Sequence, residues 1–109
     1  MKGLTIVKRT SKQEGTIRLR FRLRDGRGVD LYHKSEIDAE LKDLDKFTDT
    51  GELKPRVSVY NKQLKLDIDT EIDAMETAYR QLCEVKDKTR ITAEDFERLF
   101  QTYYIPRRM

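Results

Sequence analysis

The sequence predicts an α+β fold, in which a three-stranded antiparallel sheet is packed on one face by a long helix and followed by a short extra helix. Two patterns predict it. In residues 16–24, TIRLRFRLR, apolar side chains alternate with four arginines, as in a strand with one buried and one exposed face. Between Leu64 and Leu82, apolar residues recur at steps of three or four, as on one side of an amphipathic helix. That helix is the natural cover for the apolar face of the sheet.

Two further strands are predicted beside residues 16–24. Residues 4–9, LTIVKR, are apolar and β-branched enough for a first short strand, and residues 11–15 have turn chemistry. On the other side, the hairpin signal DGRG at residues 25–28 precedes residues 29–34, VDLYHK, which alternate again as a third strand.

The apolar residues of the third strand constrain its register. A connection with an odd number of residues buries Val29 and Leu31, whereas a one-residue slip would expose both. With a three-residue connection, Leu31 lies opposite Phe21, and Asp30 lies opposite Arg22 as an ion pair.

The helices are predicted in the second half of the chain. Residues 35–55 indicate a short helical turn or an extended connection, closed by a turn at Asp49-Thr50-Gly51. The long helix is expected over about residues 57–87. Its apolar stripe consists of Leu64, Ile68, Ile72, Met75, Tyr79 and Leu82. Residues 92–95, TAED, have the pattern of a capping box that opens a second helix through about Tyr103. The apolar side of this helix consists of Ile91, Phe96, Leu99, Phe100 and Tyr103.

Length and composition predict one small intracellular domain. The chain has 109 residues, and its single cysteine, Cys83, excludes an internal disulfide and a cysteine-based zinc cluster. We expect Cys83 to be a small buried side chain. The sequence has no apolar stretch as long as a signal peptide or a membrane span, so we expect a cytoplasmic protein that does not bind a membrane.

The net charge of +3 is divided unevenly along the chain. Residues 1–34 contain ten Lys and Arg and three acids, which makes +7, while residues 35–109 contain 13 bases and 17 acids, which makes −4. The predicted strands are therefore strongly basic. This asymmetry indicates a polyanion bound on one face, and the alternative is a charged strand that is merely solvated.

Duplex DNA is the polyanion that best suits this face. Arginine presents a planar fork that fits guanine O6 and N7 or a phosphate, and a small twisted sheet fits the major groove. We expect Arg20 and Arg22 at the strand centre to read bases. The residues expected to contact the DNA backbone are Lys8, Arg18, Arg24, Arg27 and Lys34. Tyr32 either contacts a phosphate or sugar, or packs across the strands against Arg20.

No cofactor, metal ion or small-molecule substrate is predicted. We interpret His33 as a residue at the edge of the core, because no second metal-binding side chain lies at a useful spacing. Nearly all of a group of five acids on the long helix are predicted to belong to a solvated face. They are Asp67, Asp69, Glu71, Asp73 and Glu76. The chain has no glycine-rich phosphate loop and no nucleophile–base pair, so we expect it not to be an enzyme.

The order of these motifs resembles the N-terminal arm-type DNA-binding domain of phage-type tyrosine recombinases, the integrases of bacterial mobile elements. The resemblance is carried by IRLRFRLRDGRG followed by VDLYH, then DTGELK, then NKQL at the start of the long helix, and ITAEDFERLF after it. It covers roughly residues 4–100. Related domains often carry a tryptophan just before the turn; this chain has none, and Leu44 or Phe47 would take its place.

The resemblance implies a non-catalytic domain that lays its sheet in the major groove of accessory arm sites during DNA integration and recombination. It implies residues 1–88 as the arm-binding unit and residues 89–109 as a short helix and tail leading to an absent core-binding domain. The implied partners are double-stranded DNA and other integrase protomers in a synaptic complex at the bacterial nucleoid. The alternative is a module that binds RNA or a protein through the cationic strand. The scarcity of exposed aromatic residues on the strands favours duplex DNA over RNA.

Overall fold

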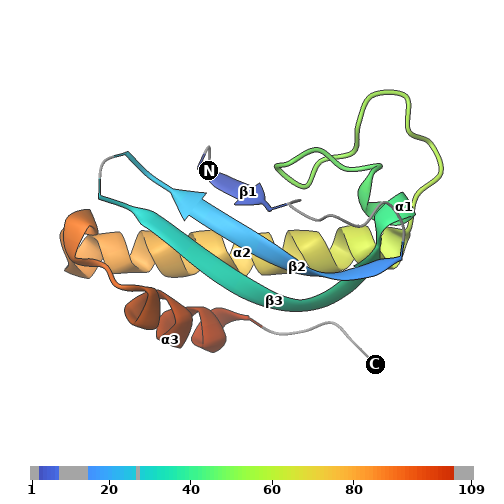
Figure 1. Cartoon of the computed structure of the whole chain (residues 1–109). Helices are drawn as coiled ribbons and strands as arrows, with labels where there is room; N and C mark the ends of the chain where they lie inside the picture. Colours follow the sequence, from blue (N-terminus) through green and yellow to red (C-terminus); the bar gives the residue numbers. More distant parts are fainter. Residues whose placement is uncertain (1–2, 8–14, 27, 105–109) are drawn as a thin grey trace.

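A computed structural model of the chain describes residues 3–7, 15–26 and 28–104. These residues form a three-stranded antiparallel sheet in the order β1-β2-β3, with the helices α2 and α3 on one side (Figure 1). The strands are β1 (Leu4–Ile6), β2 (Thr16–Arg24) and β3 (Asp30–Glu40). The helical elements are α1 (Leu41–Leu44), α2 (Lys62–Val85), the 3₁₀ helix η1 (Lys88–Arg90) and α3 (Ala93–Tyr103). The α+β class predicted from the sequence is therefore confirmed.

The connection between β2 and β3 has five residues, 25–29, which is an odd number as predicted but longer than the three-residue case considered above. Its odd length keeps Val29 and Leu31 buried, so the predicted faces are correct. The pairing is shifted by two residues, however, because Leu31 lies opposite Leu23 and His33 lies opposite Phe21. The longer connection reaches α2, where the Tyr79 hydroxyl donates a hydrogen bond to Asp25 Oδ2 at 2.7 Å.

Strand β3 continues to Glu40, whereas the sequence pattern predicts that it ends at Lys34 and is followed by a short helical turn or an extended connection. The strand is longer because residues 35–40, SEIDAE, continue its alternation of buried and exposed side chains. A bulge follows Lys34, because Arg20 pairs with Lys34 and Arg18 pairs with Asp38. The bulge adds two residues to β3, an even number, so the alternation of faces is preserved on both sides of it.

Helix α2 begins at Lys62, with Asn61 as its N-cap, and is shorter than the predicted 57–87. Five of the six residues of the predicted stripe are buried, and Ile72 is half-buried. The last three residues of α2 extend beyond the core, which leaves Cys83 exposed and corrects the expectation that it is buried. The capping box at Thr92 is confirmed: its side chain accepts from Asp95 N at 3.1 Å.

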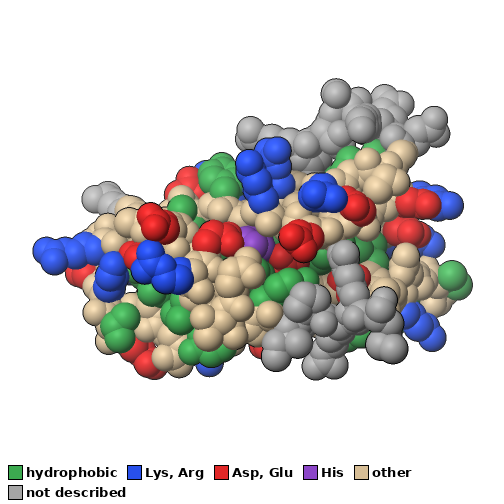
Figure 2. Space-filling model, turned by 90° about the horizontal axis from the view of Figure 1, so that it is seen from below, with side chains coloured by type: hydrophobic (Ala, Val, Ile, Leu, Met, Phe, Trp, Pro, Cys, Tyr) green, Lys and Arg blue, Asp and Glu red, His purple; other side chains and the backbone are tan. Residues whose placement is uncertain are grey.

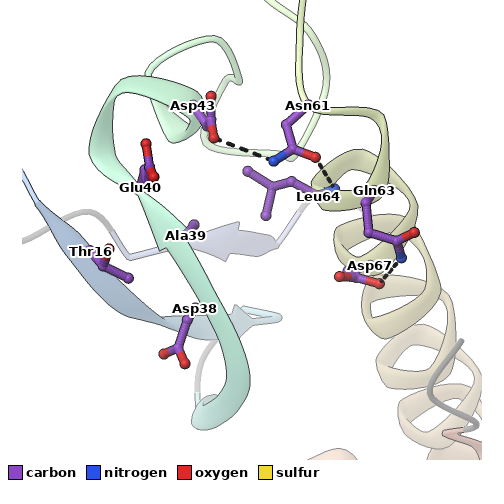
Figure 3. Close-up of a pocket in the computed structure, with 9 residues that line it drawn as sticks. All are labelled: Thr16, Asp38, Ala39, Glu40, Asp43, Asn61, Gln63, Leu64 and Asp67. Carbon is purple, nitrogen blue, oxygen red and sulfur yellow. Dashed lines mark hydrogen bonds between the residues drawn. The ribbon is translucent and has the colours of Figure 1, made fainter. Parts of the chain in front are cut away.

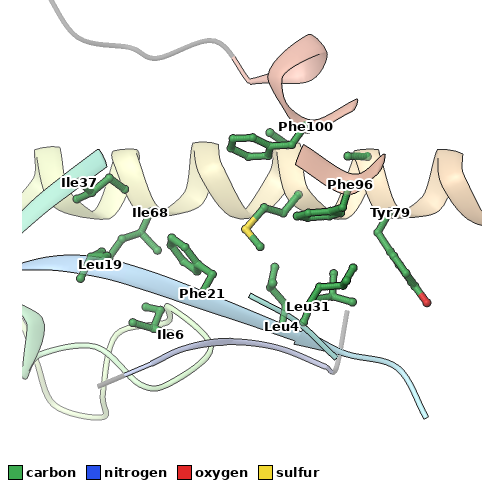
Figure 4. Packing of buried hydrophobic residues seen from close by; sticks show 14 of the residues in the cluster. Leu4, Ile6, Leu19, Phe21, Leu31, Ile37, Ile68, Tyr79, Phe96 and Phe100 are labelled. Atoms are coloured by element: carbon green, nitrogen blue, oxygen red, sulfur yellow. The ribbon is translucent and has the colours of Figure 1, made fainter. Parts of the chain in front are cut away.

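Helix α3 belongs to the main hydrophobic core. Phe96 and Phe100 are fully buried and pack in the same cluster as Phe21 and Met75 (Figure 4). The helix covers β3 beside α2, so the inner face of the sheet is closed by two helices. Leu44 and Phe47, the substitutes named for the missing tryptophan, are both buried in this core.

The predicted turn at Asp49-Thr50-Gly51 is present and is held between β1 and α2. Its backbone closes through Gly51 N to Thr48 O at 3.0 Å, and Ile6 N donates to Asp49 O at 2.6 Å. Gly51 has a φ of +85°, and an added Cβ would lie 2.9 Å from Ile72 Cδ1. Only glycine adopts this positive φ and leaves room for the Ile72 side chain without strain. No helix in the described part of the chain is long and apolar enough to cross a membrane.

Candidate nucleic-acid interface

The sheet face opposite α2 and α3, called the open face here, carries most of the predicted site residues. Strand β2 contributes Thr16, Arg18, Arg20, Arg22 and Arg24, and β3 contributes Asp30, Tyr32, Lys34, Glu36, Asp38 and Glu40. Lys8 and Arg27, which were also predicted to contact DNA, lie outside the described residues. The open face therefore combines a basic strand with a strand of mixed charge.

Charge on the open face differs between its two ends. The hairpin half, next to the β2–β3 connection, contains Arg20, Arg22, Arg24, Asp30, Tyr32 and Lys34. The distal half, beyond the bulge, contains Arg18, Glu36, Asp38 and Glu40. Cations thus exceed acids in the hairpin half and acids exceed cations in the distal half. The acidic end was missed because residues 35–40 were not recognised as strand.

Arg22 is held by two neighbours on β3. Its Nε and Nη2 donate to the two carboxylate oxygens of Asp30 at 2.7 and 2.6 Å, a bidentate ion pair. Its hydrogen bond lowers the pKa of Asp30, which is therefore ionised at neutral pH. The predicted pair thus forms, but diagonally, since Asp30 lies opposite Arg24. Tyr32 stacks on Arg22, with the guanidinium carbon 5.1 Å from the ring centroid, and not on Arg20 as proposed from the sequence.

Arg20 and Lys34 form a cross-strand pair of like charges, because they lie directly opposite each other across the β2–β3 ladder. Both side chains are exposed, and neither forms an ion pair within 4 Å with any described residue. Arg24 is also exposed and lacks such a pair in the described part of the chain. Like charges placed opposite each other destabilise a sheet. An anion bound between Arg20 and Lys34 would relieve this repulsion.

Arg18 lies in the distal half, where acidic side chains surround it. It pairs with Asp38 in the bidentate manner, with Nε 3.1 Å and Nη2 3.4 Å from the carboxylate oxygens. The hydrogen bond and the charge of Asp38 raise the pKa of Arg18, and Glu36 adds to this effect. Arg18 is therefore matched by local acids, and it contributes little field for an external anion.

The distal half ends at an acidic cavity of about 220 Å³ between β3, α1 and α2 (Figure 3). Asp38, Glu40, Asp43 and Asp67 are among its lining residues. Asn61 Nδ2 donates to Asp43 Oδ2 at 3.3 Å, and Gln63 Nε2 donates to Asp67 Oδ1 at 2.9 Å. These carboxylates disfavour a phosphate, so the cavity marks where an anionic ligand would end.

The inner side of β3 carries a polar network that sequence reasoning did not find. His33 Nε2 lies 2.7 Å from Glu71 Oε1, and His33 Nδ1 is hydrogen-bonded to Glu97 Oε1. Ser35 Oγ donates to Glu71 Oε2 at 2.6 Å and accepts from Ile37 N in the bulge. Glu71 is 1% exposed and is therefore an exception to the predicted solvated face, one that the sequence analysis did not single out. The signal was its spacing: Glu71 follows Ile68 by three residues and precedes Met75 by four, and so lies in the apolar stripe.

The geometry of this network favours the protonated form of His33. Each ring nitrogen faces a carboxylate oxygen, and an ionised carboxylate only accepts hydrogen bonds, so an imidazolium, which donates from both nitrogens, satisfies both acids. Burial would lower the pKa of His33, but the hydrogen bonds to Glu71 and Glu97 outweigh it and raise the pKa above 6.5. The expected position of His33 in the core is confirmed. Figure 2 shows the histidine (purple) between acidic side chains.

The described residues contain no group of three or more His, Cys, Asp or Glu side chains arranged to hold a metal ion. No family model, no curated protein and no solved structure matches this chain.

Proposed function

We propose that this chain binds duplex DNA with the hairpin half of its open face lying in the major groove. The observation that carries the proposal is the pair Arg20 and Lys34, two exposed cations held opposite each other without an acidic partner among the described residues. A phosphate would offset this repulsion with its negative charge, and the acceptor edge of a guanine would accept hydrogen bonds from either cation. The acidic distal half would remain outside the groove.

The side chains favour duplex DNA over RNA. The deep, narrow major groove of an RNA helix does not admit a sheet, and single-stranded RNA is bound by exposed aromatic residues that stack on bases. Among the described residues of the open face, the one aromatic side chain is Tyr32, which is 56% exposed and has Arg22 over one face of its ring. The hairpin half thus offers several cationic groups and a single tyrosine, rather than the set of aromatic side chains on which successive bases stack.

Within this site the arginines have different roles in the proposal. Arg20 is exposed at the centre of β2 and is assigned to a base edge, together with Lys34 or Arg24 on the DNA backbone. Arg22 keeps its sequence-based assignment as a base reader. The bidentate contact with Asp30 and the stacking on Tyr32 would preorganise its guanidinium, at the expense of part of its free charge.

The biological setting in the proposal is the one that the resemblance implies. The domain would be the arm-site-binding part of an integrase of a bacterial mobile element, and it would contribute no catalytic residue itself. Other integrase protomers would be its partners in a synaptic complex. The domain would be located in the bacterial cytoplasm, and at the nucleoid when it is bound to DNA.

Fluorescence anisotropy tests the proposal. The whole chain is titrated with mixed-sequence duplex DNA, single-stranded DNA and duplex RNA at two salt concentrations, beside the variant Arg20→Ala/Lys34→Ala. Binding should be tightest to duplex DNA and should fall steeply with salt. The double variant should weaken it by about 1 to 3 kcal/mol if Arg20 reads a base. The matched control is Arg80→Ala/Lys62→Ala, which removes the same charge from exposed positions on α2.

Equal losses in the two variants would show that only net charge matters and would overturn the assignment of the site. Failure of the unmodified chain to bind duplex DNA at low salt would overturn the proposed function. Binding of duplex RNA or of an acidic protein in its place would favour the interaction-module alternative.

A further inference from the structure

We propose that Lys88 and Arg90, in the connection between α2 and α3, bind DNA phosphates beside the groove that the sheet occupies. This inference rests on the proposed function and extends it to a second element. The sequence KDKTR, residues 86–90, is where the helical pattern breaks, and no role was assigned to it from the sequence.

The element η1 lies against the tip of the β2–β3 hairpin. A Cβ added to Gly26 would lie 3.2 Å from Lys88 Nζ, and one added to Gly28 would lie 3.3 Å from Thr89 Cγ2. Figure 1 shows both segments at the same end of the molecule, and Figure 2 shows Lys and Arg side chains (blue) at that end. The cationic hairpin half therefore continues past the tip onto η1.

The connection holds its backbone in a defined position. Asp87 Oδ1 accepts from Thr89 N at 3.0 Å and from Thr89 Oγ1 at 2.8 Å, which caps the 3₁₀ turn. Ile91, directly after η1, is buried in the core. The bond from Tyr79 to Asp25 ties the hairpin to the same end of α2. The two cationic residues are thus presented by a fixed backbone, which reduces the entropy lost on binding.

The charges of this connection favour an anion at η1. Lys86 is matched by Asp95, with Nζ 2.6 Å from Oδ2. Asp87 is used by the cap described above. Lys88 and Arg90 are exposed and form no ion pair within 4 Å with a described residue. Phosphate is the ligand chemistry that fits, because both residues are donors and no base-reading geometry is built around them.

The test compares two double variants with equal charge loss. Lys88→Gln/Arg90→Gln removes the proposed contacts, and Lys54→Gln/Lys62→Gln removes two exposed lysines from the α1–α2 connection and the start of α2, at the far end of the molecule (Figure 1). Affinity for several unrelated duplexes is measured by anisotropy over a range of salt. The slope of log affinity against log salt should fall by about 1.8 in the first variant, about 0.9 for each lost phosphate contact.

Lys88→Gln/Arg90→Gln should also weaken all duplexes by the same factor, because phosphate contacts carry no sequence information. An unchanged slope, or a change equal to that of the far-end control, would overturn the inference. If Arg20→Ala/Lys34→Ala still weakened binding in that case, the proposed function would stand alone. If the unmodified chain did not bind duplex DNA, both would fail. Urea unfolding of each variant shows whether the fold is retained.

Discussion

His33 on β3 and Glu71 on α2 meet in the core with 2.7 Å between Nε2 and Oε1, and together they join the sheet to its covering helices. Both side chains are almost completely buried, at 3% and 2% exposure. Glu97 on α3 and Ser35 on β3 complete their hydrogen bonds, so no polar atom of the pair lacks a partner. The network therefore links three elements at the point where β3 bulges.

Removing the carboxylate of Glu71 should destabilise the fold strongly. Glu71→Ala leaves the His33 imidazolium buried with one acidic partner, and breaking a buried ion pair costs about 3 to 5 kcal/mol. Urea denaturation of Glu71→Ala beside Asp73→Ala, an exposed acid on the same helix, measures this cost. A similar small loss in both variants would contradict the buried pair.

Stability should fall as pH is raised above neutrality. Because the folded-state pKa of His33 is raised above the ordinary 6.5, its contribution is complete below 6.5 and is lost as pH rises through the folded-state pKa. The free energy of unfolding measured from pH 6 upward should therefore decrease, and His33→Gln should flatten this part of the curve. A flat profile in the unmodified chain would contradict the protonated state.

Gly51→Ala should destabilise more than Gly15→Ala. Both glycines have positive φ, +85° and +107°, so both variants carry backbone strain of about 1 to 2 kcal/mol. Of these two, the added Cβ meets side chains of described residues at Gly51, at 2.9 and 3.0 Å, whereas at Gly15 no atom of a described residue lies within 4 Å. Thermal unfolding of the two variants compares them directly, and equal losses would show that the turn shifts freely away from α2.

Phe100→Ala should lower the free energy of unfolding of the whole domain. Phe100 is 1% exposed and its ring centroid lies 4.3 Å from that of His33, so truncation opens a cavity costing about 3 to 5 kcal/mol. The exposed neighbour Gln101→Ala should change stability by less than about 0.5 kcal/mol. Hydrogen exchange distinguishes global from local destabilisation. Loss of protection confined to the amides of α3 would contradict the prediction, because α3 would then open independently of the rest of the domain.

Asp30→Asn should tighten DNA binding if the proposed function is correct. The substitution frees the Arg22 guanidinium from its bidentate partner and removes a negative charge from the hairpin half. The guanidinium charge that Asp30 neutralises would then face the DNA, so the salt slope should steepen, by about 0.9 if one further phosphate is neutralised. Asp38→Asn, which frees Arg18 in the distal half, is the matched control and should have a smaller effect. An equal gain in both variants would show that the two halves do not differ in binding.

Local periodicity explains what could be predicted. The side chains of Leu19, Phe21 and Leu23 point to the core and the arginines between them point outward, because successive residues of a strand alternate whatever their partner. The helical stripe and the capping box at Thr92 are local in the same sense. The ion pair between Arg22 and Asp30 was also predicted, because the alternation of side chains along the two strands places both residues on the same face of the sheet.

Only the tertiary structure decided which groups meet. The alternation of faces is preserved when the strand register shifts by any even number of residues. The pairing of Arg20 with Lys34 therefore depended on the length of the hairpin connection and on how its tip contacts α2. Glu71 reads as one more surface acid until His33, 38 residues away in the chain, is placed beside it. The sequence by itself thus determined the elements and their apolar faces, because periodicity is local. Register, buried ion pairs and the division of charge on the open face depend on contacts between distant residues, which no local pattern encodes.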